Sequence, residues 1–182
     1  MGATGKLDDV EIMKRLLKYF GLTDSLNLVN LSKGTTMKDV RLKAGDLQGF
    51  NYILIELVNT KGLGLNLSGR SAEQRALVHQ WLQYNILHLT DKTSITEYVL
   101  KEMDSYLVPC TFFAGHNLTL ADPVIYLSLY PVFMDMSFQE KEKYPNLSRW
   151  FRLIQEDSEL RGKNKKVPFA SVPLYNTTNL FH

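Results

Sequence analysis

Residues 115–130 read GHNLTLADPVIYLSLY, and this stretch decides the fold. Asp122 lies in an otherwise apolar run, three residues after Thr119. In a Thr-x-x-Asp box, the threonine hydroxyl accepts from the aspartate N–H and the carboxylate accepts from the threonine N–H. A catalytic aspartate would instead need a second titratable partner, and the sequence shows none. We therefore expect Thr119 and Asp122 to form a structural cap at a helix start.

The rest of the second half has the spacing of helices. Boxes of the same type predict further helix starts, namely Ser71 with Gln74, Ser94 with Glu97, and Ser137 with Glu140. Pro145 suits the first turn of a last helix, PNLSRWFRLIQ. Pro131 lies deeper in the apolar run, so a kink or an end is expected near it. Residues 70–161 are therefore predicted to be an all-helical domain.

The first half alternates between helix and strand patterns. A helical spacing of apolar residues ends before Gly21, and residues 25–31 and 39–43 alternate like two short strands. Asp46 can cap a second helix. The apolar stripe of that helix consists of Leu47, Phe50, Leu54 and Leu57. Residues 8–60 are therefore predicted to form a small α/β unit with the order helix, strand, strand, helix.

Composition narrows the functional classes. The chain has 182 residues, of which 45% are hydrophobic and 22% charged, with a net charge of +2. This charge is too small to indicate nucleic-acid binding, although an adaptor for tRNA that uses the lysines after residue 162 is an alternative. No apolar stretch is long enough to predict a membrane span. The N-terminus lacks the apolar core of a signal peptide, so a cytoplasmic location is expected.

The order of these motifs resembles a known family. An α/β unit followed by helices, with NLTLAD at 117–122 opening a helix, resembles glutathione transferases. Together with SAEQRALVHQWLQY at 71–84, the stretch QEKEKYPNLSRWF at 139–151 more closely resembles the elongation factor 1 epsilon-like scaffold proteins of the animal multi-tRNA-synthetase complex. This resemblance implies a truncated thioredoxin-like domain at 1–65, a helical transferase-like domain at 70–161, and a tail at 162–182.

The resemblance also implies a function. It predicts a non-catalytic scaffold in translation that binds the transferase-like domains of methionyl-tRNA synthetase and glutamyl-prolyl-tRNA synthetase. The expected locations are the cytoplasm and, in addition, the nucleus. No cofactor, membrane contact or direct nucleic-acid contact is expected.

A glutathione transferase is the alternative, and its chemistry makes demands that can be checked. Such an enzyme needs a thiolate-stabilising Tyr, Ser or Cys in the first domain, and a cis-proline. The first proline of this chain is Pro109. Tyr19 and Ser25 supply hydroxyl groups, but we interpret them as a helix-face residue and a turn residue, and Cys110 as a packing residue. No catalytic, cofactor-binding or metal-binding residue is therefore expected.

Two surfaces are candidates for partner binding. Tyr52 and Ile55 lie outside the apolar stripe of their helix, which fits either contact with the helical domain or stacking on another transferase-like domain. Arg149 and Arg152 should project from the last helix when its apolar residues face the core. The resemblance implies that Arg149 meets a partner, the alternative being a solvated surface arginine. An outward guanidinium predicts that Arg149→Ala weakens binding and leaves the melting temperature nearly unchanged.

Overall fold

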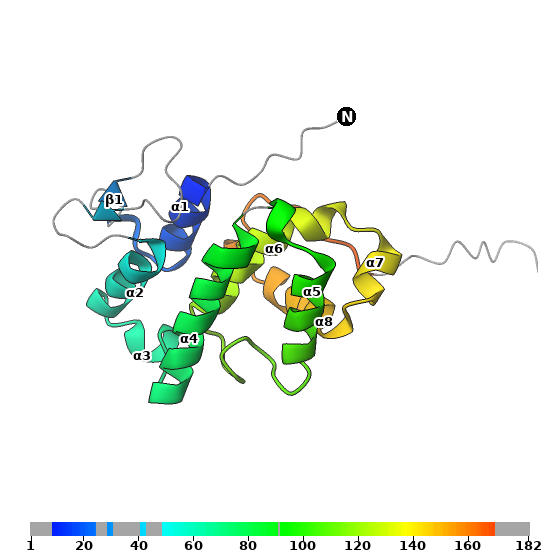
Figure 1. Ribbon diagram of the computed structural model, residues 1–182. Coiled ribbons are helices and arrows are strands. Elements are labelled where there is room, and N and C mark those ends of the chain that lie inside the picture. The colour runs from blue at the N-terminus through cyan, green and yellow to red at the C-terminus, as the bar shows by residue number, and fades with distance from the viewer. Residues whose placement is uncertain (1–8, 25–28, 31–40, 43–48, 91, 170–182) are drawn as a thin grey trace, which may run out of the picture.

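The computed structural model describes residues 9–24, 29–30, 41–42, 49–90 and 92–169 (Figure 1). Its first part contains helix α1 (Asp9–Tyr19), strands β1 (Val29–Asn30) and β2 (Arg41–Leu42), and helices α2 (Phe50–Thr60) and α3 (Gly64–Leu67). The strands pair antiparallel, with Val29 opposite Leu42. The predicted order of helix, strand, strand and helix is present. A two-strand ladder does not by itself establish the thioredoxin-like sheet that we expected.

The second part is helical, as predicted. It consists of α4 (Ala72–Tyr84), a π-helix η2 (Asn85–Leu89), a 3₁₀ turn η3 (Lys92–Ser94), α5 (Glu97–Tyr106), α6 (Ala121–Asp135), α7 (Phe138–Glu142), α8 (Pro145–Gln155) and α9 (Ser158–Arg161). No helix in the described part of the chain is long and apolar enough to cross a membrane.

Helix α6 is the centre of the molecule (Figure 1). It contacts α1, α4 and α8, and every residue from Ala121 to Leu129 is buried. A helix that is apolar all round is expected to be covered on all sides. The helix also continues through Pro131 to Asp135, so the end predicted near this proline comes a turn later. Through its contact with α1, α6 joins the first part of the chain to the second.

The spacing of apolar residues correctly predicted which side chains of α2 and α8 are buried in the core. Phe50, Leu54 and Leu57 of the predicted stripe are buried in α2, and Leu147, Phe151 and Ile154 are buried in α8. Leu47 and Asp46 lie outside the described residues. The residue at the N-cap of α2 is Gly49, whose φ of 101° suits glycine, and no side chain caps this helix.

The predicted capping boxes differ in outcome. Ser137 and Glu140 make both bonds of the box at the start of α7, as predicted. Ser71 accepts from the Gln74 N–H, but the Gln74 side chain accepts from the N–H of Arg70 rather than of Ser71.

The box predicted at Ser94 is wrong. The N-cap of α5 is Thr96, whose hydroxyl accepts from the Val99 N–H at 3.3 Å. Ser94 belongs to the preceding 3₁₀ turn, whereas Thr96 has the extended backbone that capping requires.

Candidate interaction surfaces

Asp122 is fully buried and accepts hydrogen bonds on both carboxylate oxygens. Oδ2 accepts from the N–H and the hydroxyl of Thr119, at 3.0 and 3.1 Å. Oδ1 accepts from the Phe113 N–H at 3.1 Å and from Nε1 of Trp150 at 3.0 Å. The predicted bond from the carboxylate to the Thr119 N–H is present. The hydroxyl, however, donates to Asp122, and the Asp122 N–H donates to the Thr119 main-chain oxygen.

The bonds of Asp122 connect three segments. They hold the loop before α6 through Phe113, the start of α6 through Thr119, and α8 through Trp150. Burial raises the pKa of Asp122, while the hydrogen bonds from its donors oppose that rise. Since both oxygens are occupied by protein donors, this arrangement serves packing rather than chemistry on a substrate.

Helices α5 and α8 are joined by a reciprocal pair of contacts, which we name the α5–α8 clasp. Asp104 on α5 accepts from the N–H groups of Asn146 and Leu147, at 2.7 and 2.9 Å, and so caps the start of α8. Arg149 on α8 donates from Nη2 to the main-chain oxygens of Leu107 and Cys110, at 2.8 and 2.9 Å. Each helix thus supplies a side chain that satisfies the end of the other.

The clasp corrects the expectation that Arg149 points freely outward. The residue is exposed, but one of its guanidinium nitrogens donates to the Leu107 carbonyl at the end of α5 and to the Cys110 carbonyl in the loop that follows. Arg152, one turn further along, is also exposed. Leu153, beside it, leaves 48% of its surface open to solvent. The outer face of α8 therefore combines two arginines with an exposed apolar side chain.

A groove runs along this face of α8, and we name it the α8 groove. Its volume is about 600 Å³, and it is lined by Thr111, Arg149, Trp150, Arg152, Leu153, Gln155, Glu156, Val167 and Phe169. A smaller hollow of about 290 Å³ adjoins it and shares Arg149, Arg152 and Phe169.

The second predicted surface, on α2, is divided. Tyr52 is 63% exposed, whereas Ile55 is partly buried and packs against the core. Ile55 also lines a hollow of about 340 Å³ next to α4, together with Arg75 and His79. Tyr52 is thus available to a partner, and Ile55 contributes to contacts within the chain.

Of the residues considered for enzyme chemistry, Tyr19 has a structural hydrogen bond within the chain. The Tyr19 hydroxyl donates to Oδ2 of Asp157 at 2.8 Å, which ties α1 to the start of α9. Ser25 lies outside the described residues, and Cys110 is partly buried. Among the residues that the structure describes, no cluster of His, Cys, Asp and Glu is arranged to hold a metal ion.

Sequence reasoning missed Asp104 and Gln155. Asp104 accepts from the N–H of Asn146, which lies 42 residues later in the chain, so no local capping box predicts this contact. Gln155 is buried at the end of α8 and binds the main chain of Val167, in a segment that we expected to be a tail. The only signal was the position of a polar residue next to the apolar stripe of α8.

Comparison with known proteins establishes the family. Over 131 residues the chain is 37% identical to eukaryotic translation elongation factor 1 epsilon-1 of Mus musculus, which covers 71% of this chain and 75% of that protein. The chain belongs to the elongation factor 1 epsilon-1 family. The Cricetulus griseus member is 42% identical over 112 residues, covering 60% of this chain and 64% of that protein. These matches confirm the family resemblance and agree with a role in translation.

Two further matches cover shorter parts of the chain. Residues 74–158 match the family described as nuclear-export cofactor Arc1p. Over 97 residues the chain is 30% identical to the cytoplasmic glutamate–tRNA ligase of Arabidopsis thaliana, covering 52% of this chain and 13% of that protein.

Solved structures confirm a transferase-like fold. The GST-like domain of elongation factor 1-gamma from Saccharomyces cerevisiae superposes with a TM-score of 0.57 at 18% identity, over 87% of this chain and 90% of that one. A glutathione transferase of Bombyx mori gives a TM-score of 0.58 at the same identity, over 81% of each chain. At this identity the likeness concerns the fold alone.

Proposed function

We propose that the chain is a non-catalytic scaffold that binds the transferase-like domains of aminoacyl-tRNA synthetases. The observation that carries this proposal is its membership of the elongation factor 1 epsilon-1 family. The match to a glutamate–tRNA ligase supports an association with synthetases. The partners that we propose are methionyl-tRNA synthetase and glutamyl-prolyl-tRNA synthetase, in a multi-synthetase complex that supports translation. The location that we propose is the cytoplasm, with a nuclear fraction.

Two surfaces suit such a role. The α2 surface presents the exposed Tyr52, and the α8 surface presents Arg149 and Arg152 beside the exposed Leu153. Tyrosine and arginine are enriched among the residues that dominate protein interfaces. In Figure 1 the two helices lie on different sides of α4. A scaffold with separate surfaces can hold two partners at once.

Calorimetric titration tests the scaffold. The transferase-like domain of each synthetase is purified and titrated into the full chain, and the mixture of all three is measured by light scattering. We expect both domains to bind and a ternary complex to form. Binding of neither domain would refute the proposal. Turnover of glutathione with a general electrophile, abolished by Tyr19→Phe, would favour the transferase alternative.

A further inference from the structure

Residues 163–169 form a strap that crosses the outside of the helical domain, and two side chains hold its main chain. The Tyr130 hydroxyl donates to the Lys165 oxygen at 2.9 Å. Nζ of Lys141 donates to the Pro168 oxygen at 3.1 Å. These side chains come from α6 and α7, so the strap is fixed to separate helices.

Apolar side chains of the strap are inserted between the helices. Val167 is 2% exposed. The ring of Phe169 lies 5.9 Å from those of both Phe133 and Phe151, so it joins the aromatic cluster between α6 and α8. The prediction of a tail from residue 162 therefore does not describe residues 163–169, which are packed as part of the domain.

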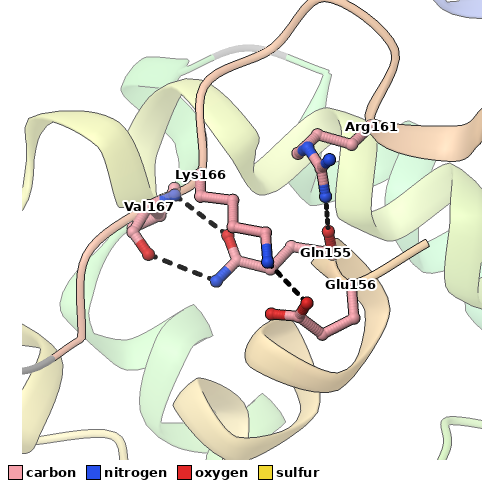
Figure 2. Close-up of polar contacts among 5 residues, drawn as sticks. All are labelled: Gln155, Glu156, Arg161, Lys166 and Val167. Atoms are coloured by element: carbon pink, nitrogen blue, oxygen red, sulfur yellow. Dashed lines mark hydrogen bonds and ion pairs between the residues drawn. The ribbon is translucent and has the colours of Figure 1, made fainter. Parts of the chain in front are cut away.

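Gln155 is the main anchor of the strap. Its buried amide faces the main chain of Val167, as Figure 2 shows. Oε1 accepts from the Val167 N–H at 2.9 Å, and Nε2 donates to the Val167 oxygen at 3.2 Å. One side chain thus pairs with both polar groups of a residue, as a neighbouring strand would. Beside it, Lys166 forms an ion pair with Glu156 at 2.5 Å (Figure 2).

The strap is one wall of the α8 groove. Val167 and Phe169 of the strap line the groove together with the arginines and Leu153 of α8. Glu156, the acidic residue of the lining, is already paired with Lys166. The groove therefore carries a net positive charge from Arg149 and Arg152, which Glu156 offsets only in part, next to an apolar surface.

We propose that Gln155 is a positioning residue for partner binding, because it fixes the strap as the second wall of the α8 groove. The arginines of α8 belong to the partner surface of the proposed function; a partner carboxylate pairs with them, and an apolar side chain next to that carboxylate packs between Leu153 and the strap. A wall that is fixed before binding avoids the entropy cost of ordering a loop. This inference rests on the proposed function and specifies the chemistry of one of its partners.

Gln155→Glu tests this role because it changes one hydrogen-bonding group and keeps the shape. The ionised carboxylate can still accept from the Val167 N–H, but it places a second acceptor against the Val167 oxygen. A protonated carboxyl group restores the missing donor. Burial raises the pKa of a carboxyl group, so this carboxyl group is protonated at a higher pH than a solvated glutamate. The variant should therefore release the strap at pH 8 and recover it as the pH falls.

Two readouts follow the strap and the partner separately. Hydrogen exchange at the Val167 amide reports on the strap, and calorimetry with each synthetase domain reports on binding. At pH 8 we expect faster exchange in the variant and a loss of about tenfold in affinity for the domain that docks at the α8 groove. Affinity for the other domain should be unchanged. Relative to the wild type at the same pH, the loss of affinity in Gln155→Glu should become smaller as the pH falls toward about 5.5.

Two further variants distinguish release of the strap from the effects of an added negative charge and of impaired folding. Gln139→Glu makes the same change at an exposed position of α7 and should leave both affinities unaltered. Phe169→Ala, at the partly exposed end of the strap, should weaken the same partner while Gln155 stays intact.

Three results would overturn the inference. In the first, Gln155→Glu exchanges the Val167 amide rapidly but keeps wild-type affinity for both domains. In the second, the variant leaves Val167 exchange unchanged. In the third, the variant loses affinity to the same extent at every pH. Each leaves the proposed function standing, provided that the wild type binds. A wild type that binds neither domain would refute the proposed function and this inference together.

Discussion

Arg149 donates from Nη2 to the main-chain oxygen of Leu107, at 2.8 Å, and so reaches from the first turns of α8 to the end of α5. Asp104 caps the start of α8 from the other helix, so side chains from both helices join the C-terminal end of α5 to the N-terminal start of α8. Arg149 therefore has a structural bond within the chain, in addition to the partner contact that the family implies.

Arg149→Ala should consequently weaken the fold as well as partner binding. The loss of a charged donor to two carbonyl groups, at an exposed position, should lower the free energy of unfolding by about 1 kcal/mol. Arg149→Lys should recover part of this loss, since an ammonium group can donate to a carbonyl but lacks the planar fork. Urea unfolding of the three proteins provides the measurement. A wild-type midpoint for Arg149→Ala would show that the clasp contributes nothing to stability.

Asp122→Asn should be more damaging than loss of an ordinary cap. Asparagine keeps one acceptor, so some of the N–H donors of Phe113, Thr119 and Trp150 would be left buried and unpaired. We expect the free energy of unfolding to fall by about 3 kcal/mol. The control is Glu140→Ala, which removes an exposed capping carboxylate and should cost much less than Asp122→Asn. Equal losses in urea unfolding would contradict the role of Asp122 as a buried connector.

Local signals predicted much of the fold, because caps and apolar stripes act within one or two turns. Ser137 with Glu140, and the buried stripe of α8, required only neighbours in sequence. Ser94 and Thr96 lie two positions apart and both can cap, so the sequence alone could not choose between them. The choice is made by the 3₁₀ turn that precedes α5.

Local sequence signals could not predict contacts between distant segments of the chain. Tyr19 and Asp157 are 138 positions apart, and their hydrogen bond depends on how α1 packs beside α9. The sequence showed Arg149 as a candidate but not its bond to Leu107, and the only sign of Gln155 was a polar residue next to the apolar stripe of α8. The sequence could thus place the candidate surface on α8, whereas the strap that forms the other wall of the α8 groove could be found only from the tertiary structure.

Tyr19→Phe should measure the link between α1 and the helical part. It removes the hydroxyl that donates to Asp157 and leaves the ring packed against Phe20. The expected fall in the free energy of unfolding is about 1 kcal/mol, because Asp157 also caps α9 and loses a partner. Tyr52→Phe, at a 63% exposed position, is the matched control and should change stability little. Equal effects of the two variants would mean that the hydrogen bond between Tyr19 and Asp157 is not stabilising.

Lys141 provides a prediction on pH dependence. Its side chain is buried under the strap, with Nζ bound to the Pro168 oxygen and 5.7 Å from the centre of the Phe169 ring. Burial lowers the pKa of Lys141 below its usual value of 10.5, and the nearby Glu140 opposes this only in part. The folded protein therefore releases the Lys141 proton at a lower pH than the unfolded chain does.

The sign of the effect follows from proton binding. Between the lowered pKa and 10.5, the unfolded chain holds more protons than the folded protein, so the contribution of Lys141 to stability rises with pH. Lys141→Met removes this titration and keeps a long apolar side chain. The free energy of unfolding of the wild type, minus that of the variant, should increase as pH rises toward 10.5. Lys143→Met, at an exposed position, controls for the loss of one positive charge. A difference that stays flat or decreases over this range would show that burial does not disfavour the charged form of Lys141.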